Sequence, residues 1–130
     1  MIVPDASTVV EVLLQTERGR RLETRLFASG ETLHVPHLID VEAAHVLRCA
    51  CLRGLIDDWR GAEALADLAA WLLSRYPHDL FLARIWMLLH SVTAYDAAYV
   101  ALAEALSVTL LTCDARLAAS HGHDAIIEVA

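Results

Sequence analysis

Short apolar runs separated by longer amphipathic segments are the dominant pattern of this chain. Residues 1–4, 33–35, 108–112 and 125–129 have the length and the apolar or β-branched content of buried strands. Helical segments lie between these runs. Strands and helices that alternate in this way are joined by right-handed crossovers, which place the strands parallel to one another. The pattern therefore predicts an α/β fold with a parallel sheet that is covered by helices on both faces.

The segments between these runs repeat apolar residues at the spacing of a helix, so each is expected to bury one face. Two of the predicted helices cover residues 15–25 and 40–53. The others begin after Asp5 or Ser7, at Asp57, after Pro77, at Thr93 and at Ala115. The expected inward positions, given helix by helix in chain order, are Val9, Val12 and Leu13; Leu22 and Leu26; Ala43, Val46, Leu47 and Ala50; Leu65, Leu68, Ala69 and Leu72; Leu82, Ile85, Trp86 and Leu89; and Ala98, Ala101, Leu102 and Ala105.

The composition places the chain among globular proteins with a large core. Apolar residues fill 57% of the 130 positions, and alanine and leucine occur 22 times each, which favours helices and excludes disorder as the main state. A chain of this length is expected to form a single domain over residues 1–130. No uncharged stretch approaches the roughly 20 residues that a membrane span needs, and the first residues do not have the pattern of a signal peptide.

Cysteine usage and charge restrict the environment and the partners. Three cysteines, an odd number, do not suit a secreted disulfide framework, so we expect a reduced, cytoplasmic protein. All ten basic residues are arginine and the formal net charge is −7, which argues against a basic nucleic-acid-binding surface of the usual kind. If the substrate has a phosphate backbone, a bound divalent cation is the obvious means of offsetting the repulsion between the phosphates and the acidic protein.

Four of the 17 acidic residues occupy positions that solubility alone does not explain. Asp5 and Asp114 each follow a predicted strand, at the edge of the sheet where α/β proteins bind ligands. Glu42 shares a helical row with Val46 and therefore points partly inward, and Asp96 lies in the first turn of a predicted helix. Helix capping or a favourable interaction with the helix dipole would also account for Asp5, Asp96 and Asp114.

The four carboxylates together indicate a particular chemistry. Gathered at one edge of a sheet, they would repel one another and raise one another's pKa unless a cation joined them. Oxygen ligands suit Mg²⁺ or Mn²⁺, and such an ion can activate water and stabilise the oxygens of an in-line attack on phosphorus. The pattern therefore predicts metal-dependent hydrolysis of a phosphodiester.

Four segments of the chain also carry a resemblance to a known family. They are Asp5-Ala6-Ser7, the helix that contains Glu42, the run from Thr93 to Glu104, and Leu111-Thr112-Cys113-Asp114-Ala115-Arg116-Leu117. In this order and at this spacing they resemble the PIN-domain ribonucleases, and among these the VapC-type toxins of bacterial toxin–antitoxin pairs. The resemblance implies a three-layer α/β/α fold with a central parallel sheet of four or five strands.

The resemblance further implies a site and a set of partners. The acidic quartet of the family falls on Asp5, Glu42, Asp96 and Asp114, with all but Glu42 as metal ligands. Ser7 and Thr112 match positions at which the family often places a hydroxyl near the metal. Such proteins cut RNA with Mg²⁺ or Mn²⁺, form homodimers and are silenced by a cognate antitoxin, so we expect an RNA substrate and these protein partners, and no membrane partner.

Other interpretations of the acidic residues were weighed against this one. A phosphoacceptor receiver domain would need paired acids after the first strand and a lysine, and the chain has no lysine. An aspartate-nucleophile phosphatase would need Asp-x-Asp, but position 7 is Ser7. The seven histidines share no helical face that would suit imidazole catalysis. A PIN-like interaction scaffold without catalytic activity stays open.

Overall fold

The computed structural model describes residues 1–130 and contains one sheet of five parallel strands. The order across the sheet is β3-β2-β1-β4-β5, so the first strand of the chain lies in the centre. In the register of this sheet Ile2 lies opposite both Leu33 and Thr109. The strands are β1 (Ile2–Pro4), β2 (Leu33–Pro36), β3 (Leu73–Tyr76), β4 (Thr109–Thr112) and β5 (Ile127–Val129).

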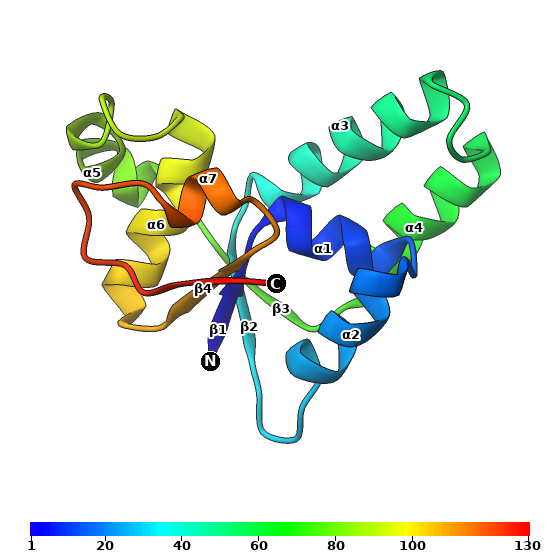
Figure 1. Ribbon diagram of the computed structural model, residues 1–130, viewed down its shortest axis with the longest axis horizontal. Coiled ribbons are helices and arrows are strands. Elements are labelled where there is room, and N and C mark those ends of the chain that lie inside the picture. The colour runs from blue at the N-terminus through cyan, green and yellow to red at the C-terminus, as the bar shows by residue number, and fades with distance from the viewer.

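Helices cover the two faces of this sheet and complete a three-layer α/β/α arrangement (Figure 1). In Figure 1 the helices α1 to α4 lie to one side of the strands, and α5 and α6 lie to the other. No helix is long and apolar enough to cross a membrane. The helices are α1 (Ala6–Leu13), α2 (Glu17–Leu26), α3 (Ile39–Leu52), α4 (Asp58–Ala70), α5 (Leu82–Met87), α6 (Ala94–Leu106) and α7 (Ala115–Ala118), and a 3₁₀ turn, η1 (His78–Phe81), precedes α5.

The central position of β1 explains its composition. Ile2 belongs to a buried cluster with Leu22 and Leu26 of α2, whereas Val3 belongs to the larger core that includes Val100 and Leu102 of α6. Successive residues of a strand point to opposite faces, and both faces are covered here, so every position of β1 is apolar. Helix α6 is buried from Ala97 to Ala103 without interruption, as expected for a helix that packs on several sides.

The strand β3 was not predicted, and the predicted inward face of the helix before it is wrong in part. Helix α4 ends at Ala70, so Leu72 lies outside it and is 95% exposed. Leu65 and Ala69 are exposed as well, because α4 packs through the row of Gly61, Ala64 and Leu68. β3 is an edge strand with a mixed sequence, Leu-Ser-Arg-Tyr, and it lacks the apolar run by which buried strands are detected.

The inward faces predicted for α5 and parts of α3 and α6 also need correction. Trp86 is 72% exposed, and Leu82 and Leu89 are exposed with it, whereas Leu88 is buried and Ile85 is half-buried. Val46 of α3 and Ala105 of α6 are exposed too. Helical spacing shows that apolar residues share a face, but it does not show whether the protein covers that face. These residues therefore leave apolar surface open to solvent.

Candidate active site

Asp5 is the most buried of the four predicted site residues, at 5% exposure, and it is held by three hydrogen bonds. It caps α1 directly after β1, and its Oδ1 accepts bonds from the Thr8 backbone N–H at 2.9 Å and from the Ser7 hydroxyl at 2.6 Å. Its Oδ2 accepts a bond from the Thr112 hydroxyl at 2.5 Å. The capping interpretation is therefore correct for Asp5, but a carboxylate has about four acceptor positions and only three are used.

Ser7 and Thr112 connect the ends of β1 and β4. The Ser7 hydroxyl donates to Asp5 and accepts a bond from the Cys113 backbone N–H at 2.9 Å. The Thr112 hydroxyl donates to Asp5 and accepts a bond from the Asp114 backbone N–H at 2.9 Å. Both hydroxyls therefore fix Asp5 relative to the loop that carries Asp114. A role of either hydroxyl near a metal stays a prediction.

Asp114 lies at the start of α7 and is engaged by a cation from its own helix. Its Oδ1 accepts a capping bond from the Arg116 backbone N–H at 2.8 Å. The Arg116 guanidinium also donates to Oδ1 at 3.3 Å and to Oδ2 at 3.2 Å. These bonds lower the pKa of Asp114, the side-chain bond from Arg116 most of all. Capping is thus an observed role of Asp114 as well.

Glu42 and Asp96 lie on α3 and α6 and have the opposite electrostatic environment. Burial raises the pKa of Glu42, and repulsion from Asp96 and Asp5 raises it further. Burial likewise raises the pKa of Asp96, and Asp5 and Asp114 add to that effect. Both carboxylates are therefore costly to ionise, chiefly because they are partly buried and further because other acids are near.

Tyr99 belongs to the same site, although sequence reasoning assigned it no role. Its hydroxyl donates a hydrogen bond of 2.5 Å to Oε2 of Glu42. Burial, followed by the charge of Glu42, raises the pKa of Tyr99, so the hydroxyl remains a donor. Tyr99 lies three residues after Asp96 on α6, a spacing that puts both on one side of the helix. That spacing is a signal by which it could have been found.

The structure thus brings Asp5, Glu42, Asp96 and Asp114 to the carboxyl ends of β1 and β4, within range of one another's charge. Their oxygen donors fit the preference of Mg²⁺ or Mn²⁺. In this arrangement, however, no three histidine, cysteine, aspartate or glutamate side chains converge closely enough to hold one metal ion. The donor chemistry fits a divalent cation, whereas the ligands are not assembled around one position.

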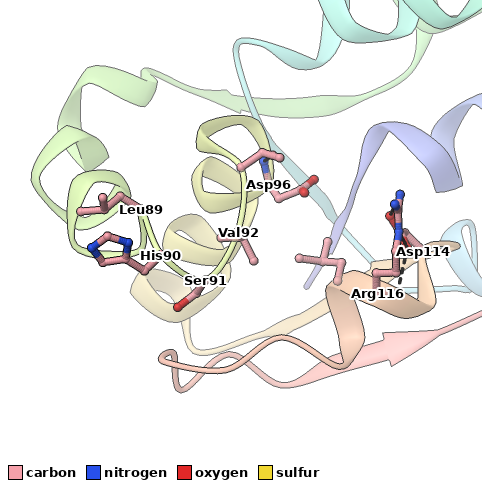
Figure 2. Close-up of a pocket in the computed structure, with 9 residues that line it drawn as sticks. Leu89, His90, Ser91, Val92, Asp96, Asp114 and Arg116 are labelled. Atoms are coloured by element: carbon pink, nitrogen blue, oxygen red, sulfur yellow. Dashed lines mark hydrogen bonds and ion pairs between the residues drawn. The ribbon is translucent and has the colours of Figure 1, made fainter.

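An open cleft of about 540 Å³ gives access to part of this site. Asp96 lines one side of the cleft, and Asp114 and Arg116 line another (Figure 2). Glu42 instead lines a neighbouring groove between α3 and α6, with Val41, His45, Val46 and Tyr95. A polyanion that enters the cleft would meet two carboxylates and the guanidinium of Arg116.

Comparisons with known proteins agree with this fold. The family model described as "PIN domain" matches residues 2–120. Ribonuclease VapC12 of Mycobacterium tuberculosis is 45% identical over 129 residues, which cover 99% of this chain and 98% of that protein. The chain belongs to the PIN-domain family, and its relatives place it among the VapC-type members.

Two solved structures have the same fold at low sequence identity. The structure of VapBC2 from Rickettsia felis, bound to a DNA fragment from their promoter, matches with a TM-score of 0.69 and 13% identity, covering 99% of this chain and 98% of that one. VapC20 of Mycobacterium tuberculosis, described as a sarcin-ricin loop cleaving toxin, matches with a TM-score of 0.68 and 17% identity, covering 92% and 94%. The sheet and its helices are therefore those of PIN domains.

Proposed function

We propose that this protein is an endoribonuclease toxin that hydrolyses RNA phosphodiester bonds with the help of Mg²⁺ or Mn²⁺. The observation that carries the proposal is the placement of Asp5, Glu42, Asp96 and Asp114 at one edge of the sheet, where burial and, to a lesser extent, neighbouring acids raise the pKa of Glu42 and Asp96. Acids placed so that they raise one another's pKa are characteristic of sites that bind cations or perform acid–base chemistry. The relatives named as VapC ribonucleases support RNA as the substrate.

In this proposal Asp5, Asp96 and Asp114 hold the metal ion, and Glu42 is the fourth catalytic acid. A bound Mg²⁺ or Mn²⁺ would lower the pKa of a coordinated water and neutralise charge on the phosphate oxygens. Thr112 and Ser7 fix the carboxylate of Asp5 in the orientation it has at the end of β1. Tyr99 does the same for Glu42, so two of the four acids are oriented by buried hydroxyl donors.

A cognate antitoxin and a second copy of this chain are the partners in the proposal. The relative solved as VapBC2 supports an antitoxin. Exposed apolar side chains support protein partners in general, because surfaces of this kind are often interaction sites. They occur near the end of α3 and the start of α4 and around α5, and include Leu52, Leu55 and Trp59, and Leu82, Trp86 and Met87.

The test is to incubate the purified protein with total cellular RNA and to map the new 5′ ends. We expect defined cuts that require Mg²⁺ or Mn²⁺, disappear in chelator and are lost in the Asp96→Asn variant. The matched control is Glu63→Gln, which removes one exposed acid on α4. Cuts that persist in chelator would contradict the requirement for a metal ion. Cuts that persist in Asp96→Asn would contradict the assignment of Asp96 to the active site.

An inactive interaction scaffold is the second candidate. The observation that favours it is that no three of the acids converge on one position. Under this alternative the folded protein would bind partners and cut no RNA at any metal concentration. The same RNA assay therefore separates the two functions.

A further inference from the structure

Arg116 is the single arginine among the nine residues that line the cleft beside Asp96 and Asp114. The chain has a net charge of −7, and the carboxylates of Asp96 and Asp114 line the same cleft. A phosphate that approaches Asp96 would therefore be repelled by these carboxylates and attracted by the guanidinium of Arg116. Its side chain is 93% exposed, so nothing in the protein prevents it from turning toward a ligand.

In this structure the guanidinium is paired with Asp114. It donates to both carboxylate oxygens, at 3.3 Å and 3.2 Å, and Oδ1 also carries the capping bond from the Arg116 backbone. A divalent cation and a guanidinium compete for the same oxygens, because both are positive and both need the lone pairs of the carboxylate. Arg116 in this position hinders Asp114 from serving as a metal ligand.

The pair is one that a phosphate can replace. Exposed ion pairs of arginine and aspartate are weak, since water and salt screen them. A phosphodiester offers two oxygens in a geometry that the planar guanidinium fork fits as well as it fits a carboxylate. A phosphate in the cleft can therefore replace Asp114 as the partner of Arg116 at little cost in free energy.

We propose that Arg116 is the phosphate-binding residue of this cleft, and that an RNA phosphate draws it away from Asp114 and so frees Asp114 for the metal ion. Substrate binding and completion of the metal site are then coupled through one side chain. The inference rests on the proposed function, because it assigns the substrate contact of that same site.

The first test measures Mn²⁺ binding in the absence of RNA, by calorimetry, for the wild type and for Arg116→Gln. Removal of the guanidinium leaves both oxygens of Asp114 free, so Mn²⁺ should bind roughly three- to tenfold more tightly. Arg53→Gln is the matched control, because Arg53 is exposed, has no ion pair and lies at the end of α3. Equal Mn²⁺ affinities in Arg116→Gln and the wild type would overturn the competition for Asp114.

The second test measures the binding of a fluorescein-labelled, single-stranded RNA of mixed sequence in chelator, where no cleavage occurs. Arg116→Gln should bind this RNA roughly three- to tenfold more weakly, and the dependence of log K on log salt should be shallower by about 0.7, the value for one phosphate contact on a single strand. Arg116→Lys should restore the salt dependence, since it keeps the charge, but only part of the affinity, since it lacks the fork. Equal affinities, or no binding by either protein, would overturn the phosphate contact.

The expected changes in affinity have opposite signs, because Arg116→Gln should bind Mn²⁺ more tightly and RNA more weakly. This pair of results distinguishes the proposed role of Arg116 from simple damage to the fold. A misfolded variant would bind both Mn²⁺ and RNA less tightly. The role of Arg116 and the nuclease activity can be refuted independently of each other. If the wild type cuts no RNA but Arg116→Gln still tightens Mn²⁺ and weakens RNA binding, the proposed activity is wrong and the role of Arg116 stands.

Discussion

The hydroxyl of Tyr99 on α6 donates a 2.5 Å hydrogen bond to the carboxylate of Glu42 on α3. Tyr99 is 1% exposed, and burial raises the pKa of Glu42. A half-buried acid on one helix is therefore oriented by a buried donor on another. The catalytic geometry in the proposal depends on how α3 and α6 pack, as well as on the ends of the strands.

We expect Tyr99→Phe to weaken both the fold and the activity. The ring keeps its packing, but Glu42 loses its donor, which should lower the free energy of unfolding by about 1–3 kcal/mol. RNA cleavage should fall through kcat, because the orientation of Glu42 is lost and the surface that RNA contacts is unchanged. Denaturant titration and steady-state kinetics measure the two effects. Tyr95→Phe, an exposed tyrosine on the same helix, is the control, and a normal kcat in Tyr99→Phe would contradict the role of Tyr99.

Asp96→Asn should reduce RNA cleavage by at least about a hundredfold while the protein stays folded. The amide has nearly the volume of the carboxylate but cannot supply the negative charge that a metal ion needs. Asp5→Asn is expected to act in the same way. The measurement is metal-dependent cleavage of a susceptible RNA, with circular dichroism to verify the fold. Wild-type rates in both variants would exclude the acidic residues as the site.

The pH dependence of stability in chelator should differ between the wild type and Asp96→Asn. The pKa of Asp96 is raised in the folded protein above its ordinary value of 3.8, so folding favours the protonated acid. In the wild type, protonated Asp96 therefore contributes to the stability of the folded state at a pH below 3.8. This contribution to stability is lost as the pH rises through the pKa that Asp96 has in the folded protein. Asp96→Asn does not titrate at this position, so its stability relative to the wild type should increase as the pH rises from about 4 toward neutrality. A relative stability that stays constant over this range would show that folding does not raise the pKa of Asp96.

Mn²⁺ should raise the melting temperature of the wild type by an amount that grows with the logarithm of free metal above the dissociation constant. Asp114→Asn should shrink this shift, because it removes a proposed ligand. In chelator it should melt slightly lower, since it loses the ion pair with Arg116, which is exposed and therefore screened by water and salt. Thermal scans with chelator and with metal measure both effects. A full metal shift in Asp114→Asn would assign Asp114 to capping alone.

Thr112→Val tests the connection between the ends of β1 and β4. Thr112 is fully buried, and its hydroxyl serves both Asp5 and the backbone of Asp114. Its loss leaves a buried carboxylate oxygen and a backbone N–H without this partner, which should lower the free energy of unfolding by about 1–3 kcal/mol. Thr109→Val, on the same strand but only half-buried, is the control. Equal losses in the two variants would contradict a special role of the Thr112 hydroxyl.

The sequence was sufficient for the parts of the fold that rest on strong local patterns. Buried runs such as Ile2-Val3 and Leu110-Leu111 predicted their strands, and the positions of Asp5 and Asp114 after such runs predicted that they meet at one edge. β3 was missed because an edge strand with Ser74 and Arg75 needs no continuous apolar run. The exposure of Trp86 was missed because its helical repeat does not tell whether another surface covers it.

The interactions of the candidate site were less accessible to sequence reasoning. Acids were found because their positions relative to strands and helices are unusual, whereas the partners of these acids are ordinary residues at ordinary positions. The helical spacing puts Tyr99 on the same side of α6 as Asp96, but nothing in the local pattern identifies Glu42 as its partner or distinguishes Arg116 from other exposed arginines. Their contacts with Glu42 and Asp114 depend on how α3, α6 and α7 are placed in space. The roles of the four acids themselves stay predictions.

The strand order has a consequence for how the protein is made. β1 is synthesised first, but it pairs with β4, and Asp5 is bonded to Thr112, 107 residues later in the chain. While the ribosome is still adding the residues before β4, one side of β1 has no strand beside it and Asp5 lacks that partner. A growing chain therefore cannot hold the four acids in their final places. If the protein is the nuclease proposed here, it stays harmless to the RNA of its own ribosome until residue 114 has emerged.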